Sequence, residues 1–223
     1  MDYIDNPRHP FDGFDEVEDA DYREMMPFVN AVENLQADFV GQWLCEHLEL
    51  TSVIDVGCAT GIYLKPYKAT GIEVFGVDAC TTAGEFLEPS EFERIDLRFP
   101  YCPAKRYDLA LCTEVGEHLK PRFAERLVDT LWDCSDIIYW SAAVPGQGGT
   151  FHYNERPVQF WMDLFWMRHG YSLHPLQDEL REFLNNYREE ERNHLVSGWL
   201  LNNSYLLWRT PELVAAEPWS APG

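Results

Sequence analysis

Apolar positions in the first half of the chain follow two different periods. Between Pro27 and Leu48 they recur every three or four residues, which predicts a helix with one buried face. Two shorter runs, Thr51–Val56 and Ile72–Val77, are instead rich in β-branched residues and predict buried parallel strands. The segment between them contains Pro66, which we expect to shorten or kink its helix.

The rest of the chain alternates between predicted strands and predicted helices. Further strands are expected at Arg94–Leu97, Tyr107–Thr113, Asp136–Ser141 and Tyr205–Trp208, and helices at Arg122–Trp132 and Pro157–His169. Such alternation is typical of a doubly wound α/β sheet with its ligand crevice at the carboxyl ends of the strands. The charged segment Gln177–Leu195 has apolar residues at helical spacing, and it predicts either an exposed helix or a hairpin insertion.

Composition divides the chain into three parts. Residues 1–26 are acidic and contain two prolines and a glycine, which predicts an arm rather than a packed element. Residues 27–210 carry the periodic segments, and we expect one domain there, because 223 residues with 46% hydrophobic content suffice for one core. Residues 211–223, rich in proline and alanine, predict a loosely held tail.

Charge limits the classes of partner. A formal net charge of −21 repels nucleic acid and anionic membranes, so small-molecule or protein acceptors are favoured. No apolar run of about 18 residues is present, and the first residues lack the features of a signal peptide, which predicts a cytoplasmic protein. The six cysteines are scattered, without a C-x-x-C pair or a Cys/His cluster at zinc spacing, so we expect reduced thiols and no metal.

The segment Val53–Gly61, V-I-D-V-G-C-A-T-G, carries the most specific pattern in the sequence. A hydrophobic strand leads into a turn where Gly57 and Gly61 let a ligand approach the backbone. The turn differs from the dinucleotide pattern G-x-G-x-x-G, and Asp55 precedes its first glycine. About twenty residues later the run V-F-G-V-D ends at Asp78, where a carboxylate can accept the hydrogens of both ribose hydroxyls.

These motifs resemble those of class I S-adenosylmethionine (SAM)-dependent methyltransferases, over about Val53 to Tyr171. The resemblance implies a Rossmann-like fold, with a mostly parallel seven-stranded sheet and helices on both faces. It also implies that the turn holds the methionine part of SAM, with Asp55 near its amino group. Where the family usually has glycine this chain has Ala59, which we expect to be accommodated with a negative φ.

The resemblance extends to the ends of the following strands. Asp96 matches the acidic position that hydrogen-bonds the adenine amino group, with Leu97 near the ring. The segment L-C-T-E-V-G-E-H-L is similar to the family's next strand end, where residues border the cofactor. The cofactor-binding residues implied are therefore Asp55, Gly57, Cys58, Ala59, Gly61, Asp78, Ala79, Asp96, Leu97, Thr113, Glu114 and Val115.

Candidate catalytic and acceptor-binding residues follow the cofactor motifs. His118 ends the E-V-G-E-H segment, and its imidazole can accept a proton near neutral pH. The later polar segment S-A-A-V-P-G-Q-G-G-T-F-H-Y-N-E resembles the loop that small-molecule methyltransferases place over the acceptor. From it we select Gln147, His152 and Asn154 as acceptor contacts, with His152 as a second catalytic candidate.

Several of these residues also have ordinary structural interpretations. Asp55 and Asp78 can cap helices or turns, as aspartates after strands often do, and Asp96 can simply start a turn. His118 can cap its helix or pair with Glu114. These alternatives remain open on the sequence alone.

The sequence as a whole predicts transfer of a methyl group from SAM to a small-molecule acceptor, leaving S-adenosylhomocysteine (SAH). A sugar or a secondary metabolite suits the motifs, and the choice between O- and N-methylation stays open. Alternatives are a catalytically idle SAM-binding partner subunit and a protein methyltransferase. A nicotinamide-dependent oxidoreductase is disfavoured by the absence of G-x-G-x-x-G. The aromatic residues between Phe160 and Met167 predict a buried helix face or a homodimer interface.

Overall fold

The computed structural model describes residue 24 and residues 34–80, 83–190 and 202–209. Seven strands within these ranges form one sheet in the order β3-β2-β1-β4-β5-β7-β6. They are β1 (Ser52–Val56), β2 (Glu73–Asp78), β3 (Phe92–Arg94), β4 (Leu109–Thr113), β5 (Ile137–Ser141), β6 (Ser172–Leu173) and β7 (Tyr205–Trp208). The first five run parallel, whereas β7 is antiparallel to β5 and β6. The predicted doubly wound, mostly parallel sheet is confirmed.

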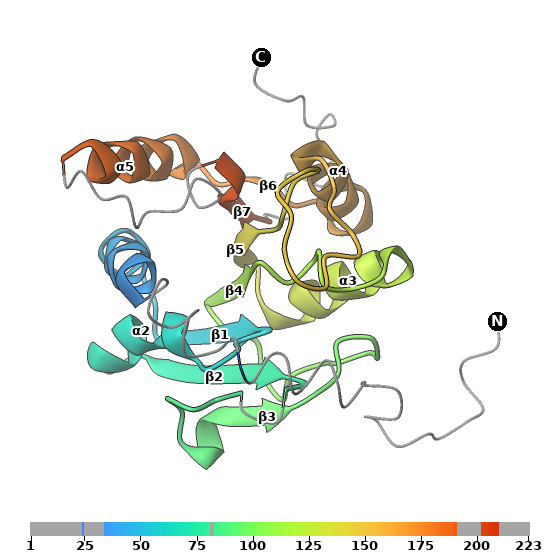
Figure 1. The fold of residues 1–223 in the computed structure, drawn as a ribbon. Helices are drawn as coiled ribbons and strands as arrows, with labels where there is room; N and C mark the ends of the chain where they lie inside the picture. Colours follow the sequence, from blue (N-terminus) through green and yellow to red (C-terminus); the bar gives the residue numbers. More distant parts are fainter. Residues whose placement is uncertain (1–23, 25–33, 81–82, 191–201, 210–223) are drawn as a thin grey trace.

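Helices cover both faces of this sheet (Figure 1). One face carries a helix over residues 34–47, the short η1 (Ile62–Leu64) and α2 (Lys65–Ala69), and α5 (Gln177–Glu190). The other carries α3 (Ala124–Cys134), preceded by η3 (Pro121–Phe123), and α4 (Val158–His169); η2 (Pro89–Glu91) precedes β3. Because successive strand residues point to opposite faces, Val53 packs on the first side and Ile54 on the second.

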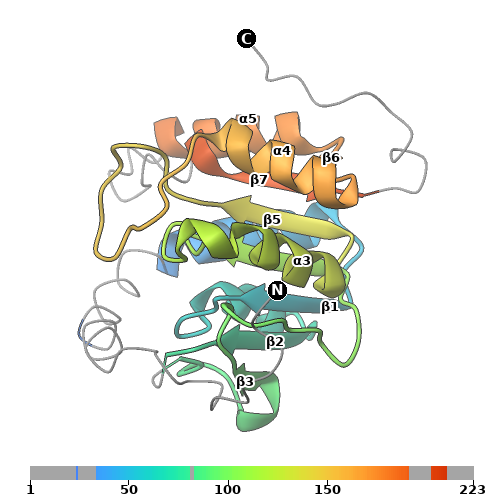
Figure 2. The same cartoon turned by 90° about the vertical axis from the view of Figure 1, so that its right-hand side faces the viewer.

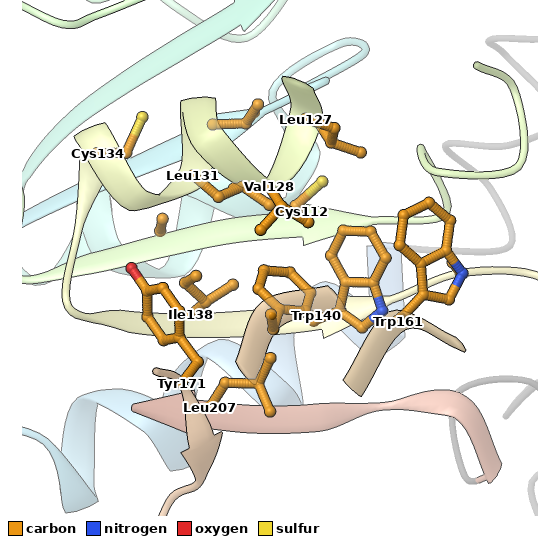
Figure 3. Packing of buried hydrophobic residues seen from close by; sticks show 14 of the residues in the cluster. Cys112, Leu127, Val128, Leu131, Cys134, Ile138, Trp140, Trp161, Tyr171 and Leu207 are labelled. Carbon is orange, nitrogen blue, oxygen red and sulfur yellow. The ribbon is translucent and has the colours of Figure 1, made fainter. Parts of the chain in front are cut away.

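The aromatic part of the core lies between β5 and the helices α3 and α4 (Figure 3). The Trp140 ring of β5 lies 4.9 Å from the Trp161 ring and 5.1 Å from the Phe165 ring, measured between centroids. Tyr171 is buried beside them, and its hydroxyl donates to the carbonyl of Ser135. The buried helix face predicted between Phe160 and Met167 is confirmed for Trp161 and Phe165, whereas Met167 is 72% exposed.

Two sequence-based predictions of elements differ in part from the structure. The third strand occupies Phe92–Arg94 rather than Arg94–Leu97, because pairing with β2 places it there and Asp96 starts a turn instead. The charged segment from Gln177 forms the helix α5, so the helical alternative is confirmed over Gln177–Glu190, but only one face of this helix is exposed. Its Leu180 and Leu184 are buried in the core on the helix 34–47 face, so tertiary packing covers its apolar stripe.

Other predictions of elements agree with the structure within a few residues. Pro66 stands in the first turn of the five-residue α2, so the helix after the glycine turn is short, as expected. The six cysteines are free thiols, and four of them are buried. The acidic arm, apart from residue 24, and the tail after residue 210 lie outside the described residues. No helix in the described ranges has the length and apolar character needed to cross a membrane.

The packing of α3 on the sheet makes a direct prediction about stability. Leu131 is fully buried among the residues of Figure 3, so Leu131→Ala is expected to lower the free energy of unfolding by about 2–5 kcal/mol. Met167→Ala on α4 is the control, and it should change this quantity by less than about 0.5 kcal/mol. Urea denaturation followed by circular dichroism measures both, and equal effects would contradict the packing described.

Candidate functional site

The glycine turn after β1 is shaped by its neighbours at the carboxyl end of the sheet. Gly57 and Gly61 have φ values of +85° and +84°, which favour glycine. The N–H groups of Gly57 and Cys58 donate to the carbonyl of Val77 at 2.8 and 3.1 Å. A Cβ atom at Gly57 would lie 2.4 Å from Cγ2 of Val115, so the segment after β4 packs directly on this turn. The turn therefore joins the ends of three strands.

Asp78 connects the end of β2 to the same turn. Its Oδ2 accepts a hydrogen bond from the N–H of Ala59 at 2.9 Å, and its Oδ1 accepts one from the N–H of Cys80 at 2.8 Å. Burial raises the pKa of this carboxyl, although the two N–H donors act in the opposite direction. The carboxylate thus fixes the shape of the turn and still has lone pairs for a ligand.

The expected backbone conformation of Ala59 is wrong. Its φ is +46°, in the left-handed region, rather than negative. This conformation costs an alanine roughly 1–2 kcal/mol, and the hydrogen bond from its N–H to Asp78 offsets the strain. Tertiary contact with the second strand therefore decides the conformation that the residue type alone disfavours.

Asp96 and Leu97 lie at the end of the third strand region. Asp96 is buried and pairs with Arg98, whose Nη2 donates to Oδ2 at 2.6 Å and whose backbone N–H donates to Oδ1 at 2.9 Å. The turn interpretation of Asp96 is confirmed by these bonds. Its contact with an adenine amino group stays a prediction, as does the packing of Leu97, which is buried in the core on the α3 side.

The segment that follows β4 carries a half-buried acid, Glu114, and a buried one, Glu117. Glu114 has a φ of +53°, and its Oε2 accepts a hydrogen bond from Nε2 of Gln147 at 2.7 Å. Glu117 is 0% exposed, and within the described residues neither of its carboxylate oxygens has a hydrogen-bond partner. Burial raises the pKa of both carboxyls, and the neighbouring Glu114 raises that of Glu117 further. These acids form a pair beside the predicted cofactor site.

The two candidate catalytic histidines lie together, although they are far apart in the sequence. The rings of His118 and His152 are nearly perpendicular, with centroids 4.9 Å apart. Burial, with a smaller effect of His152, lowers the pKa of His118 to about 4, so its imidazole is neutral near pH 7. One ligand atom each from Glu117, His118 and His152 lies within 4.8 Å of the others. This group has the composition of a cation site.

Glu155 organises the segment between β5 and α4, which extends past the carboxyl end of the sheet (Figure 2). Its carboxylate accepts hydrogen bonds from the N–H groups of Gly146 and Gly148 at 2.8 and 2.7 Å. The same carboxylate lies 3.1 Å from Nδ1 of His152. The N–H of Asn154 donates to the carbonyl of Glu117 at 3.0 Å, which fixes this segment against the end of β4.

Two predicted acceptor contacts already have protein partners. Oε1 of Gln147 accepts from Nδ2 of Asn203 at 2.9 Å, while its Nε2 contacts Glu114. Asn154 is buried, and its Oδ1 accepts a hydrogen bond from Nε of Arg156 at 2.8 Å. Both side chains therefore support the loop, and their contact with an acceptor stays a prediction.

Sequence reasoning missed Glu117 and Glu155. Glu117 immediately precedes His118 in the E-V-G-E-H segment, so its proximity to the site was available from the sequence. Glu155 follows His152 by three residues in a glycine-rich segment, and an acid beside glycine N–H groups is a signal for a loop anchor. Neither signal indicates burial, which only the packing of the loop reveals.

Comparisons with known proteins agree with this arrangement. A family described as methyltransferase domain matches residues 9–136, which is more than half of the chain. No curated protein matches the sequence. Magnesium protoporphyrin IX methyltransferase from Synechocystis PCC 6803, solved with bound SAH, is 18% identical, with a TM-score of 0.57 over 88% of this chain and 95% of that chain.

Two further solved structures are similar to this chain to different extents. The plantazolicin methyltransferase BpumL, in complex with a desmethyl plantazolicin analogue and SAH, is 15% identical, with a TM-score of 0.53 over 89% of this chain and 91% of that one. DesVI from Streptomyces venezuelae is 16% identical, with a TM-score of 0.47 over 60% of this chain. This chain spans 62% of the length of DesVI.

The contacts of Glu155 predict how the loop depends on it. Removing this carboxylate in Glu155→Ala frees the N–H groups of Gly146 and Gly148, so their hydrogen exchange should accelerate by about tenfold or more. Glu182→Ala, an equal charge change at an exposed position of α5, should leave these rates unchanged. Exchange followed by NMR or mass spectrometry measures both, and unchanged protection in Glu155→Ala would contradict its role as anchor.

Proposed function

Because the chain belongs to the methyltransferase-domain family, we propose that it transfers the methyl group of SAM to a small-molecule acceptor. The chain is a class I SAM-dependent methyltransferase, and SAM is its cofactor. The observation that carries the proposal is the connection between the glycine turn and Asp78. It joins two of the residues predicted to bind SAM into one rigid edge.

Different residues at this edge of the sheet are proposed to bind different parts of SAM. Gly57 lacks the Cβ atom that would meet Val115, so the turn can pack against the segment after β4. We assign the methionine part to this turn with Asp55, and the ribose hydroxyls to Asp78, whose oxygens retain accepting capacity. The remaining contacts proposed are Cys58, Ala59, Gly61, Ala79, Asp96, Leu97, Thr113, Glu114 and Val115.

The chemistry is a displacement at a methyl carbon. SAM supplies a sulfonium methyl group: a bond forms from the acceptor oxygen or nitrogen to carbon, and the carbon–sulfur electron pair passes to sulfur, leaving SAH. A protonated acceptor must also lose a proton. His118 and His152 are the candidates to accept it, but a pKa of about 4 makes His118 a weak base. Positioning of the acceptor is therefore the larger contribution of these residues.

Charge and relatives support a small-molecule acceptor. The net charge of −21 opposes binding of nucleic acid, since phosphates would meet an acidic surface. One structural neighbour is named for magnesium protoporphyrin IX and another was solved with a desmethyl plantazolicin analogue. We propose that the acceptor of this chain is also a small molecule.

Calorimetric titration tests the cofactor site. The wild-type protein should bind SAM and SAH but not NAD, at both low and high salt. Asp78→Ala removes a charged hydrogen-bond acceptor, so SAM affinity should fall by about tenfold or more. Asp178→Ala, at an exposed position of α5, is the matched control and should bind as the wild type does. Folded wild-type protein that binds neither SAM nor SAH would refute the proposal.

The transfer itself is tested with SAM labelled in the methyl group and a panel of sugar and secondary-metabolite acceptors. Label in an acceptor supports the proposed class. Transfer only to a basic protein substrate would replace it with a protein methyltransferase. SAM binding without transfer to any acceptor would favour the idle partner subunit.

A further inference from the structure

Three potential metal ligands converge beside the predicted cofactor site. One ligand atom each from Glu117, His118 and His152 lies within 4.8 Å of the other two. First-row divalent ions bind such atoms at about 2.0–2.2 Å, so two ligands of a tetrahedral site are about 3.4 Å apart. Binding one ion would draw these three side chains closer together. Two imidazoles and one carboxylate form a ligand set that divalent first-row ions bind, with positions left open for a further ligand.

The state of Glu117 points to a cation as the missing partner. Its side chain is fully buried, and within the described ranges neither carboxylate oxygen has a hydrogen-bond partner. Oε1 of Glu114 is also buried and without a partner in this part of the chain. A buried carboxylate that lies beside a second acid, Glu114, is costly in free energy unless a positive charge or a proton compensates for it. Either a proton or a metal ion must compensate for these charges.

Both imidazoles are arranged as metal-binding histidines are. Nδ1 of His152 lies 3.1 Å from Oε1 of Glu155, and a ring N–H of His118 donates to the backbone carbonyl of Phe151. Each imidazole thus has one nitrogen committed to a second partner, which leaves the other nitrogen with its lone pair. A Cβ atom at Gly149 would lie 2.3 Å from Nε2 of His152, so only glycine at this position leaves room for the ring.

We propose that Glu117, His118 and His152 bind one divalent first-row transition metal ion, such as zinc or manganese, with Glu155 orienting His152. The site lies close to the cofactor turn, because Val115, two residues before Glu117, packs on Gly57. A divalent ion there would orient an acceptor hydroxyl and make it more acidic. This role in holding the acceptor rests on the proposed function, whereas the metal site rests on these residues alone.

Metal titration of the full chain after dialysis against EDTA tests the proposal. Co²⁺ serves as the spectroscopic probe, with Zn²⁺, Mn²⁺ and Mg²⁺ compared by calorimetry. We expect one Co²⁺ per chain with visible absorption bands typical of nitrogen ligation, and a higher melting temperature with metal. Glu117→Gln, of equal shape, and His152→Ala should lose all three effects. His174→Ala, at a histidine outside the group, should retain them.

A milder pair of variants leaves every ligand in place. Gly149→Ala places a methyl group against the ring of His152, whereas Gly148→Ala, also at a positive φ, meets no atom within 4 Å. Only the first should weaken Co²⁺ binding. If Glu117→Gln does not fold, Co²⁺ binding by His152→Ala, Gly149→Ala and Gly148→Ala still tests whether the metal binds at this group.

SAH binding measured on the same samples separates the two proposals. Wild-type protein that binds SAH but no divalent metal would overturn the metal site and leave the methyltransferase proposal standing. Co²⁺ binding that persists in His152→Ala would also overturn it, as binding elsewhere. Metal binding by folded protein that does not bind SAH would support the site and contradict the proposed function.

Discussion

The Asp78 carboxylate at the end of β2 holds the glycine turn after β1 in place. One oxygen accepts the N–H of Ala59 in the glycine turn, and the other accepts that of Cys80 after β2. Gly57 packs on Val115 so closely that even a methyl group would not fit, which fixes the end of β4 against the same turn. Glu117 and His118 follow within three residues. The same small set of contacts therefore positions the predicted cofactor residues and the acid–histidine group, which consists of Glu117, His118 and His152.

Three glutamate side chains, those of Glu114, Glu117 and Glu155, surround the region where the acceptor is expected. Glu155 is satisfied by glycine N–H groups and His152, so it can stay ionised, and these hydrogen bonds lower its pKa. Glu114 and Glu117 lie in a less polar environment, and burial raises the pKa of both. An acidic chain that buries such groups must compensate for them with protons or cations. A metal ion held by Glu117 would supply this compensation where the acceptor is expected.

Much of the fold was predictable because hydrophobic period and strand order are local and geometric signals. The alternation of strands and helices predicted the sheet, and carboxyl ends of parallel strands necessarily meet at one edge. The third strand was misplaced because it lies at the edge of the sheet, where pairing with β2 decides its bounds. Asp96 was predicted to contact adenine, but Arg98 two residues later already pairs with it.

The remaining features depend on contacts between distant segments. The left-handed conformation of Ala59 follows from its bond to Asp78, which no local propensity encodes. His118 and His152 were both selected from the sequence, yet their proximity, and the burial of Glu117 beside them, arise when the loop before α4 folds onto the end of β4. A hydrophobic pattern does not predict contacts between such distant segments. The proximity of Glu117, His118 and His152 therefore could not be predicted from the sequence.

A crystal structure of the protein grown with SAH would test the position of the cofactor. We expect SAH along the carboxyl ends of β1, β2 and β4, with its ribose hydroxyls on Asp78 and its sulfur directed toward His118 and His152. SAH bound elsewhere, or bound with Asp78 outside hydrogen-bonding distance of the ribose, would contradict it.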